Sequence, residues 1–209
     1  MACRSSARAV WFLGLLVLAA WPARGQGPCR IAFPHDANPT PITDDDICNF
    51  HQVEPDFYRG GRPRPSAFPK LVRLGIRTII DLEGSANAER EQAAVAELNR
   101  RLPAEQRLEF ISFPIEQKEI ESTGVSHERM QSLLRLVQQA KRPVFVHCYL
   151  GRDRVALVVA LHRILQGQMT YEEALQEAVH YRFNADDSPL RRTLDRYKSP
   201  KELQSLLRP

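Results

Sequence analysis

One short segment carries the residue types and the spacing for nucleophilic chemistry at a phosphate group. His147 and Cys148 follow an apolar β-type run, and a helical pattern begins at Arg154. Five residues separate Cys148 from Arg154, which is enough backbone to surround a tetrahedral anion with N–H groups at the start of a helix. The same positive field lowers the pKa of a cysteine thiol. We therefore predict a thiolate nucleophile at Cys148.

The neighbouring residues fit a phosphate site better than a structural role for the cysteine. A cysteine at the end of a strand is usually a small core residue, but that interpretation does not explain Gly151 and Arg154 at these positions. The planar guanidinium of Arg154 is predicted to hold two phosphate oxygens. The residues predicted to bind phosphate are Cys148, Tyr149, Leu150, Gly151, Arg152, Asp153 and Arg154.

These residues carry a resemblance to a known superfamily. The segment resembles the His-Cys-x-x-Gly-x-x-Arg loop of cysteine-dependent protein tyrosine and dual-specificity phosphatases. Residues 49–63 and 74–82 resemble the opening of the compact atypical dual-specificity phosphatases of bacteria, plants and fungi, and the likeness extends to Tyr197. The resemblance implies hydrolysis of phosphate monoesters through a cysteinyl-phosphate intermediate. It also implies that His147 tunes the thiolate.

Two residues compete as the proton donor for the leaving oxygen. The family usually supplies an aspartate from an upstream loop, whereas residues 114–121 contain only glutamates, of which Glu116 is the first choice. A glutamate in a mixed-charge run is more often a solvated surface charge. Asp153 is the other candidate, although two neighbouring arginines favour its ionised form. Glu116 ranks slightly above Asp153 at this stage.

Val155 departs from the family pattern. The family has Ser or Thr after the arginine, and its hydroxyl helps to expel the sulfur from phosphate. Loss of such a donor costs about tenfold in the affected step, so the hypothesis is that phosphoenzyme breakdown is slow and that Val155→Thr raises turnover. A low-turnover phosphate-binding pseudophosphatase is one alternative. A rhodanese-like sulfurtransferase, whose loop holds one residue fewer, is another.

Several substrate classes remain open. Phosphorylated proteins, phosphoinositides and inositol phosphates all supply a phosphate monoester. Arg59, Arg62 and Arg64 form a basic cluster that either borders an acidic substrate or is a solvated positive edge. No cofactor and no metal are expected, because the histidines show no ligand spacing. The oligomeric state is not indicated.

Strands that alternate with helices must position this loop. An α/β fold is predicted, with a central, mainly parallel sheet flanked by helices in a cysteine-phosphatase-like three-layer α/β/α arrangement. The phosphate loop then lies at the carboxyl end of a strand, where such sheets bind ligands. Strands are expected at 57–59, 78–82, 108–113 and 144–146, and helices at 66–74, 88–101, 126–140, 155–166, 171–183 and 189–197.

The first twenty-five residues have the pattern of an export signal. Arg4 and Arg8 precede an apolar stretch of eleven residues, and small residues stand at positions 23 and 25. A bilayer crossing takes about 20 apolar residues, so an uncleaved membrane anchor is the less favoured alternative. Cleavage lowers the net charge from +4 to +1, and no nucleic-acid partner is expected. The predicted protein is periplasmic or secreted, without a stable membrane anchor.

Cysteine usage fits an oxidising compartment. After cleavage Cys29, Cys48 and Cys148 remain, and the economical pairing joins Cys29 to Cys48 and leaves Cys148 free. The alternative leaves all three unpaired. The domain plan is a signal at 1–25, an irregular Pro-rich leader at 26–48, a phosphatase domain at 49–198 and a tail at 199–209.

Overall fold

The structure, a computed structural model, describes residues 42–207. The predicted export signal, Cys29 and most of the predicted leader lie outside the described residues. Within the described part of the chain, no helix combines the length and the apolar character that a bilayer crossing requires.

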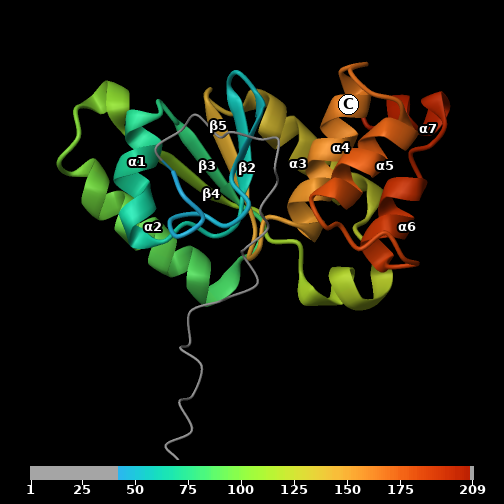
Figure 1. Ribbon diagram of the computed structural model, residues 1–209, viewed down its shortest axis with the longest axis horizontal. Helices are drawn as coiled ribbons and strands as arrows, with labels where there is room; N and C mark the ends of the chain where they lie inside the picture. The colour runs from blue at the N-terminus through green and yellow to red at the C-terminus, as the bar shows by residue number, and fades with distance from the viewer. Residues whose placement is uncertain (1–41, 208–209) are drawn as a thin grey trace, which may run out of the picture.

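A five-stranded sheet forms the centre of the fold (Figure 1). Its order is β1-β2-β5-β3-β4. β1 is antiparallel to β2, and all other neighbours are parallel, which confirms the mainly parallel sheet. The strands are β1 His51–Glu54, β2 Phe57–Gly60, β3 Thr78–Asp81, β4 Glu109–Ser112 and β5 Val144–His147.

Helices cover both faces of this sheet. Figure 1 shows α1 and α2 on one side and the helices α3 to α7 on the other. The α-helices are α1 Phe68–Arg73, α2 Ser85–Asn99, α3 His127–Gln139, α4 Asp153–Leu165, α5 Tyr171–His180, α6 Pro189–Asp195 and α7 Pro200–Ser205. A capping box of Thr170 and Glu173 stands at the start of α5. The three-layer α/β/α prediction is confirmed.

The central strand β5 is buried on both faces, because it lies between β2 and β3 and each face has its own apolar core. Side chains alternate along a strand. Val144 and Val146 therefore pack into the core shared with α3 and α4, while Phe145 packs on the side of α1 and α2. The last residue of β5, His147, follows Phe145 on that second side, and its ring stacks on the Phe145 ring.

Residues on both sides of the predicted phosphatase domain, 49–198, pack against its core. Residues 42–48 have no helix or strand, as expected for a leader, but Ile42 and Ile47 are buried in the core beneath α1 and α2. The expected tail contains α7, and Leu206 after it is 1% exposed within the other core. Burial of apolar surface stabilises both segments against the domain. The domain therefore includes residues on both sides of 49–198.

Candidate active site

The predicted phosphate loop connects β5 to α4 and forms the wall of a cavity. The cavity has a volume of about 100 Å³, and the Cys148 side chain, 3% exposed, contributes to its lining. Six of the seven predicted phosphate-binding residues meet there, together with one residue from the segment after β4. The lining residues are Ile120, Cys148, Tyr149, Leu150, Arg152, Asp153 and Arg154.

Amide groups of the loop converge on the Cys148 sulfur. The main-chain N–H groups of Gly151, Arg152 and Val155 donate hydrogen bonds toward it, and the Arg154 guanidinium attracts its negative charge. The amide of Val155 thus supplies a donor at the position whose side chain lacks a hydroxyl. The Val155 side chain itself is fully buried in the core. Amides and a guanidinium around one buried sulfur are the arrangement that a phosphate loop requires.

The charge state of the thiol differs from the sequence prediction. Burial raises the pKa of Cys148, because a buried thiolate loses its hydration, and the amides with Arg154 oppose this effect without outweighing it. The loop lowers the pKa of this thiol as predicted, but the sequence did not indicate the larger opposing effect of burial. The loop amides and Arg154 therefore offset part of the cost of a buried thiolate.

Gly151 gives the loop its shape. Its φ of 67° lies in the left-handed region, and a Cβ at this position would lie 2.4 Å from the Gly60 carbonyl carbon. Its carbonyl oxygen accepts hydrogen bonds from Asn49 Nδ2 at 3.0 Å and Arg59 Nη2 at 2.7 Å. These bonds hold the carbonyl against the side chains behind the loop, which leaves the following amides free to face the sulfur.

We expect Gly151→Ala to lower both stability and activity. The left-handed φ costs an alanine about 1 kcal/mol, and forced overlap with backbone typically costs a further 1–3 kcal/mol. Displacement of the amides is expected to reduce kcat/KM by roughly 10²-fold. Gly167→Ala is the matched control, because Gly167 has the same φ of 67° with nothing within 4 Å of the added Cβ. Thermal melts and phosphatase assays that give equal losses for the two variants would contradict this assignment.

Arg59 is a buried cation behind the loop that the sequence did not place there. Its side chain is 1% exposed and stacks on the Tyr181 ring at 4.1 Å. Burial lowers the pKa of Arg59 to about 10, so it stays charged at neutral pH. Among the described residues no carboxylate pairs with it, and its charge interacts favourably with Cys148. Arg59 therefore places a buried positive charge behind the loop.

The other two arginines of the predicted basic cluster, Arg62 and Arg64, are not buried behind the loop as Arg59 is. Arg62 pairs with Glu83, and its guanidinium lies 4.9 Å from the Tyr149 ring centre. Arg64 is exposed. The prediction of a single basic cluster was therefore wrong, because the three side chains separate into a buried, a paired and a solvated group.

The two candidate proton donors, Asp153 and Glu116, lie in different surroundings. Asp153 lines the cavity, and its Oδ1 accepts a hydrogen bond from the Asn184 amide at 2.8 Å. Glu116 is exposed and is not among the lining residues. Its neighbour Glu119 has a structural role, because it binds Arg129 at 2.7 Å and accepts the Glu116 amide at 2.7 Å. The geometry thus reverses the order expected from the sequence and favours Asp153.

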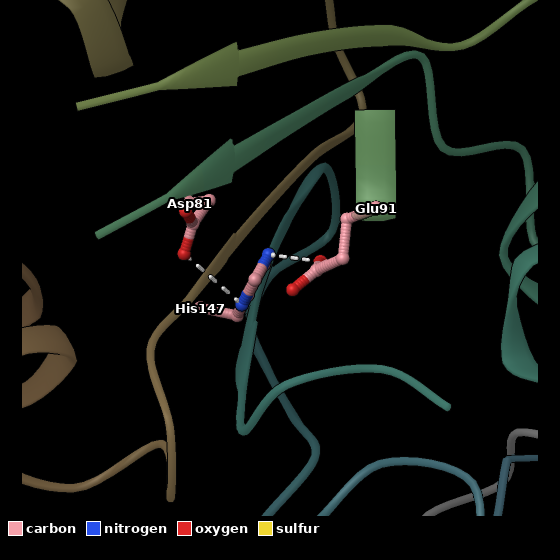
Figure 2. Close-up of side chains that lie close together, drawn as sticks. All are labelled: Asp81, Glu91 and His147. Carbon is pink, nitrogen blue, oxygen red and sulfur yellow. Dashed lines mark ion pairs between the residues drawn. The ribbon is translucent and has the colours of Figure 1, made fainter. Parts of the chain in front are cut away.

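His147 lies away from the cavity. The ring has no exposed surface and sits on the side of the sheet covered by α2, where Asp81 and Glu91 flank it (Figure 2). Neither carboxylate was among the predicted site residues. Asp81 ends β3, the strand beside β5, and Glu91 lies on α2, which covers this face of the sheet.

Comparison with known proteins identifies the family. The family described as DSP-PTPase phosphatase fused to NAD+ kinase matches residues 28–193. The chain belongs to this phosphatase family. It is a cysteine-dependent phosphatase of the atypical dual-specificity group, which confirms the resemblance seen in the sequence.

Some relatives of the chain are named as protein phosphatases, and others are named as inositol diphosphatases. OCA1 of Mycosarcoma maydis, named as a tyrosine-protein phosphatase, is 32% identical over 130 residues, covering 56% of this chain and 70% of OCA1. The dual specificity protein phosphatase TpbA of Pseudomonas aeruginosa is 25% identical over 145 residues, 68% of this chain and 59% of TpbA. The inositol diphosphatase DSP3 of Arabidopsis thaliana is 31% identical over 119 residues, 56% of this chain and 55% of DSP3. The chain thus spans little more than half the length of two of these relatives.

Solved structures share the fold. The crystal structure of P. aeruginosa TpbA has a TM-score of 0.64 at 19% identity and covers 81% of this chain and 96% of that chain. The core catalytic domain of the PP-IP phosphatase SIW14 from S. cerevisiae has a TM-score of 0.57 at 16% identity, with 76% and 90% covered.

Proposed function

We propose that this phosphatase hydrolyses phosphate monoesters through a cysteinyl-phosphate intermediate. The Cys148 thiolate attacks phosphorus in line, the P–O bond to the leaving group breaks, and the leaving oxygen takes a proton from an acid. Water then attacks the same phosphorus, which releases inorganic phosphate and restores the sulfur. The observation that supports this mechanism is the convergence of three amides and Arg154 on one buried sulfur.

The same groups suit the transition state of both steps. In phosphoryl transfer the charge spreads over the three equatorial oxygens, and catalysis is mostly positioning and electrostatic stabilisation. The loop amides and the Arg154 guanidinium are fixed donors for those oxygens. The Arg154 Nε is held by the Ile115 carbonyl at 3.0 Å, so the remaining guanidinium nitrogens are free to bind phosphate.

We propose an aryl phosphate such as phosphotyrosine as the substrate class. Ile120, Tyr149 and Leu150 give the cavity an apolar rim, and Tyr149 is 55% exposed. An aromatic ring packs on such a rim. A TpbA variant was crystallised in complex with pTyr. Inositol phosphates are the second candidate, because DSP3 is named an inositol diphosphatase.

Trapping the intermediate tests the mechanism. Full-length protein is mixed with para-nitrophenyl phosphate, quenched with acid and analysed by peptide mass spectrometry, with Cys148→Ser as the control. The expected result is one phosphoryl group on the peptide that contains Cys148, and none in the control. Release of para-nitrophenol that does not depend on Cys148 would overturn the mechanism. Equal or faster release from an inositol diphosphate than from a phosphotyrosine peptide would favour the second substrate class.

The proton donor is tested by paired substitutions. Asp153→Asn is expected to lower kcat for an alkyl phosphate by about 10²-fold, because general acid catalysis contributes at least that much. The loss is expected to shrink with para-nitrophenyl phosphate, whose phenolate leaves without a proton. Glu116→Gln is expected to leave both rates unchanged. The reverse pattern, with the large loss of activity in Glu116→Gln, would identify Glu116 in the segment after β4 as the proton donor.

We also propose that the protein is exported to the periplasm or the medium. The pattern of residues 1–25 supports this localisation. Cys48 is disulfide-bonded, with its partner outside the described residues, and disulfides persist in oxidising compartments. Cys29 remains the predicted partner. The mass of the secreted protein is expected to correspond to a chain that begins after Gly25, and retention of the full chain in the membrane fraction would contradict export.

A further inference from the structure

Tyr149 is a large aromatic residue that lines the catalytic cavity and is nevertheless exposed. It follows the nucleophile Cys148 directly in the chain, and it is 55% exposed. Exposed side chains change rotamer rapidly unless something holds them. The contacts of Tyr149 show that both its main chain and its ring are held in one position.

The main chain of Tyr149 is fixed by the segment that follows β2. A Cβ at Gly61 would lie 3.1 Å from the Tyr149 carbonyl oxygen and 2.8 Å from the Cys48 Cβ. The two segments therefore approach each other as closely as a glycine permits. The amide of the next residue, Arg62, donates a hydrogen bond to the Tyr149 carbonyl at 3.1 Å. Two consecutive residues thus fix the peptide that follows Tyr149.

The Tyr149 ring is held by the side chain of the same arginine. The guanidinium carbon of Arg62 lies over the ring, 4.9 Å from its centre, within the range in which a cation attracts the face of an aromatic ring. Arg62 is not among the described residues that line the cavity, whereas Tyr149 is. Arg62 therefore supports one face of the ring, and the opposite face is available to a substrate.

The orientation of the Arg62 guanidinium is fixed in turn by Glu83, which follows β3. Arg62 Nε donates to Glu83 Oε2 at 2.9 Å, and Nη2 donates to Oε1. A bidentate pair of this kind defines the plane of the guanidinium and leaves its faces for stacking. The Glu83 side chain is 14% exposed, and it accepts a third hydrogen bond from Asn87 Nδ2 at 3.1 Å. The carboxylate is therefore a fixed support for the arginine.

We propose that Tyr149 determines a preference for phosphates that carry an aromatic ring, and that Arg62 and Glu83 position Tyr149 for this role. The inference rests on the proposed function and deepens it. The loop amides and Arg154 converge on the sulfur and recognise the phosphate group, which all monoesters share. Discrimination among monoesters must therefore come from contacts with the rest of the substrate.

Positioning of the ring before binding makes this contact more favourable. A side chain that is already held loses little rotamer freedom when a ligand packs on it, so less of the contact energy is lost to ordering. Two aromatic rings in contact also attract each other beyond the effect of the buried area. Arg62 and Glu83 are positioning residues, because neither is among the described residues that line the cavity.

A purely structural role of the ion pair is the competing explanation. Arg62 follows β2 and Glu83 follows β3, so their pairing also joins the ends of two strands. A structural role predicts that loss of the pair weakens binding of every phosphate ligand equally. The positioning role predicts a loss that falls on ligands with an aromatic ring.

Two non-hydrolysable probes test the inference. Phenylphosphonate and methylphosphonate share the phosphonate group and differ in the ring, and their binding to the full-length protein is measured by calorimetry. We expect the wild type to bind phenylphosphonate about tenfold more tightly, the scale of one aromatic contact. Tyr149→Ala is expected to lower this ratio to about one. Tyr149→Phe keeps the ring and is expected to keep the preference.

The positioning pair is tested with the same ratio. Arg62→Ala and Glu83→Ala are each expected to lower the preference for phenylphosphonate to about threefold or less, because the ring then has to be ordered on binding. Arg64→Ala is the matched control, because Arg64 is an exposed arginine of the same segment. It is expected to keep the wild-type ratio. Thermal melts check that each variant is folded.

Several outcomes would overturn the inference. Equal affinity of the wild type for the two phosphonates, or an unchanged ratio in Tyr149→Ala, would remove Tyr149 as the determinant of specificity. An unchanged ratio in Arg62→Ala and Glu83→Ala, or equal losses for both probes, would leave the ion pair with a structural role only. None of these measurements requires turnover. Absence of Cys148-dependent hydrolysis would therefore overturn the proposed function separately.

Discussion

Cys148→Ser is expected to lower kcat for para-nitrophenyl phosphate by roughly 10⁴-fold or more, the scale seen when a nucleophile is removed. A serine hydroxyl at this position remains protonated at neutral pH, because its pKa lies far above that of a thiol. The amides of Gly151, Arg152 and Val155 stay in place. Binding of the substrate phosphate is therefore expected to persist while the chemistry stops.

The measurement is steady-state hydrolysis combined with binding of a phosphotyrosine peptide by calorimetry. Cys148→Ala is the matched variant, because it removes both the sulfur and the hydroxyl. Similar peptide affinity in the two variants, with no turnover in either, is the expected result. A kcat of Cys148→Ser within tenfold of the wild-type kcat would show that the Cys148 sulfur is not the nucleophile.

Arg154→Lys is expected to reduce kcat/KM by about 10³-fold, which corresponds to roughly 4 kcal/mol of transition-state stabilisation. Lysine keeps the positive charge but lacks the planar fork that binds two phosphate oxygens. It also lacks the Nε that donates to the Ile115 carbonyl at 3.0 Å. The segment after β4 is then no longer tied to the phosphate loop by this bond.

Arg152→Lys is the matched control for this substitution. Arg152 also lines the cavity, and its Nε donates to the Arg182 carbonyl at 3.0 Å. Its replacement is expected to cost less than about tenfold, because its contribution to the sulfur is the main-chain N–H, which a lysine keeps. Arg154→Ala should in addition raise the pKa of Cys148 further, since Arg154 lowers it, and alkylation should then require a higher pH. Equal losses in the two lysine variants would contradict the special role of Arg154.

The sequence predicted the parts of this site that are local in the chain. Cys148, Gly151 and Arg154 belong to one contiguous loop, and the strand and helix on either side of it have clear apolar patterns. β2, β3, β4 and β5 were predicted within one residue at each end. β1 was missed, because His51–Glu54 has a single β-branched residue and lies at the edge of the sheet.

The residues that support the loop from behind were not predictable in the same way. Arg59 contacts Gly151 because β2 pairs with β5, and Glu91 contacts His147 because α2 packs on that face of the sheet. No local pattern distinguishes Arg59 from Arg62 or Arg64, or Glu91 from Glu89. The direction of the Cys148 pKa was missed for a related reason. Its burial depends on packing of the whole core.

The attachments of the loop to the chain beyond α5 bear on how far the protein can be shortened. Arg152 donates a hydrogen bond to the Arg182 carbonyl, and Asp153 accepts one from the Asn184 amide. The C-terminal part of the phosphate loop is therefore held by residues that follow α5. A fragment cut after α4 would retain the nucleophile and every parallel strand and still lose these fastenings. Besides the core residues after α4, the smallest working enzyme must therefore keep Arg182 and Asn184, whose main-chain groups bind the side chains of Arg152 and Asp153.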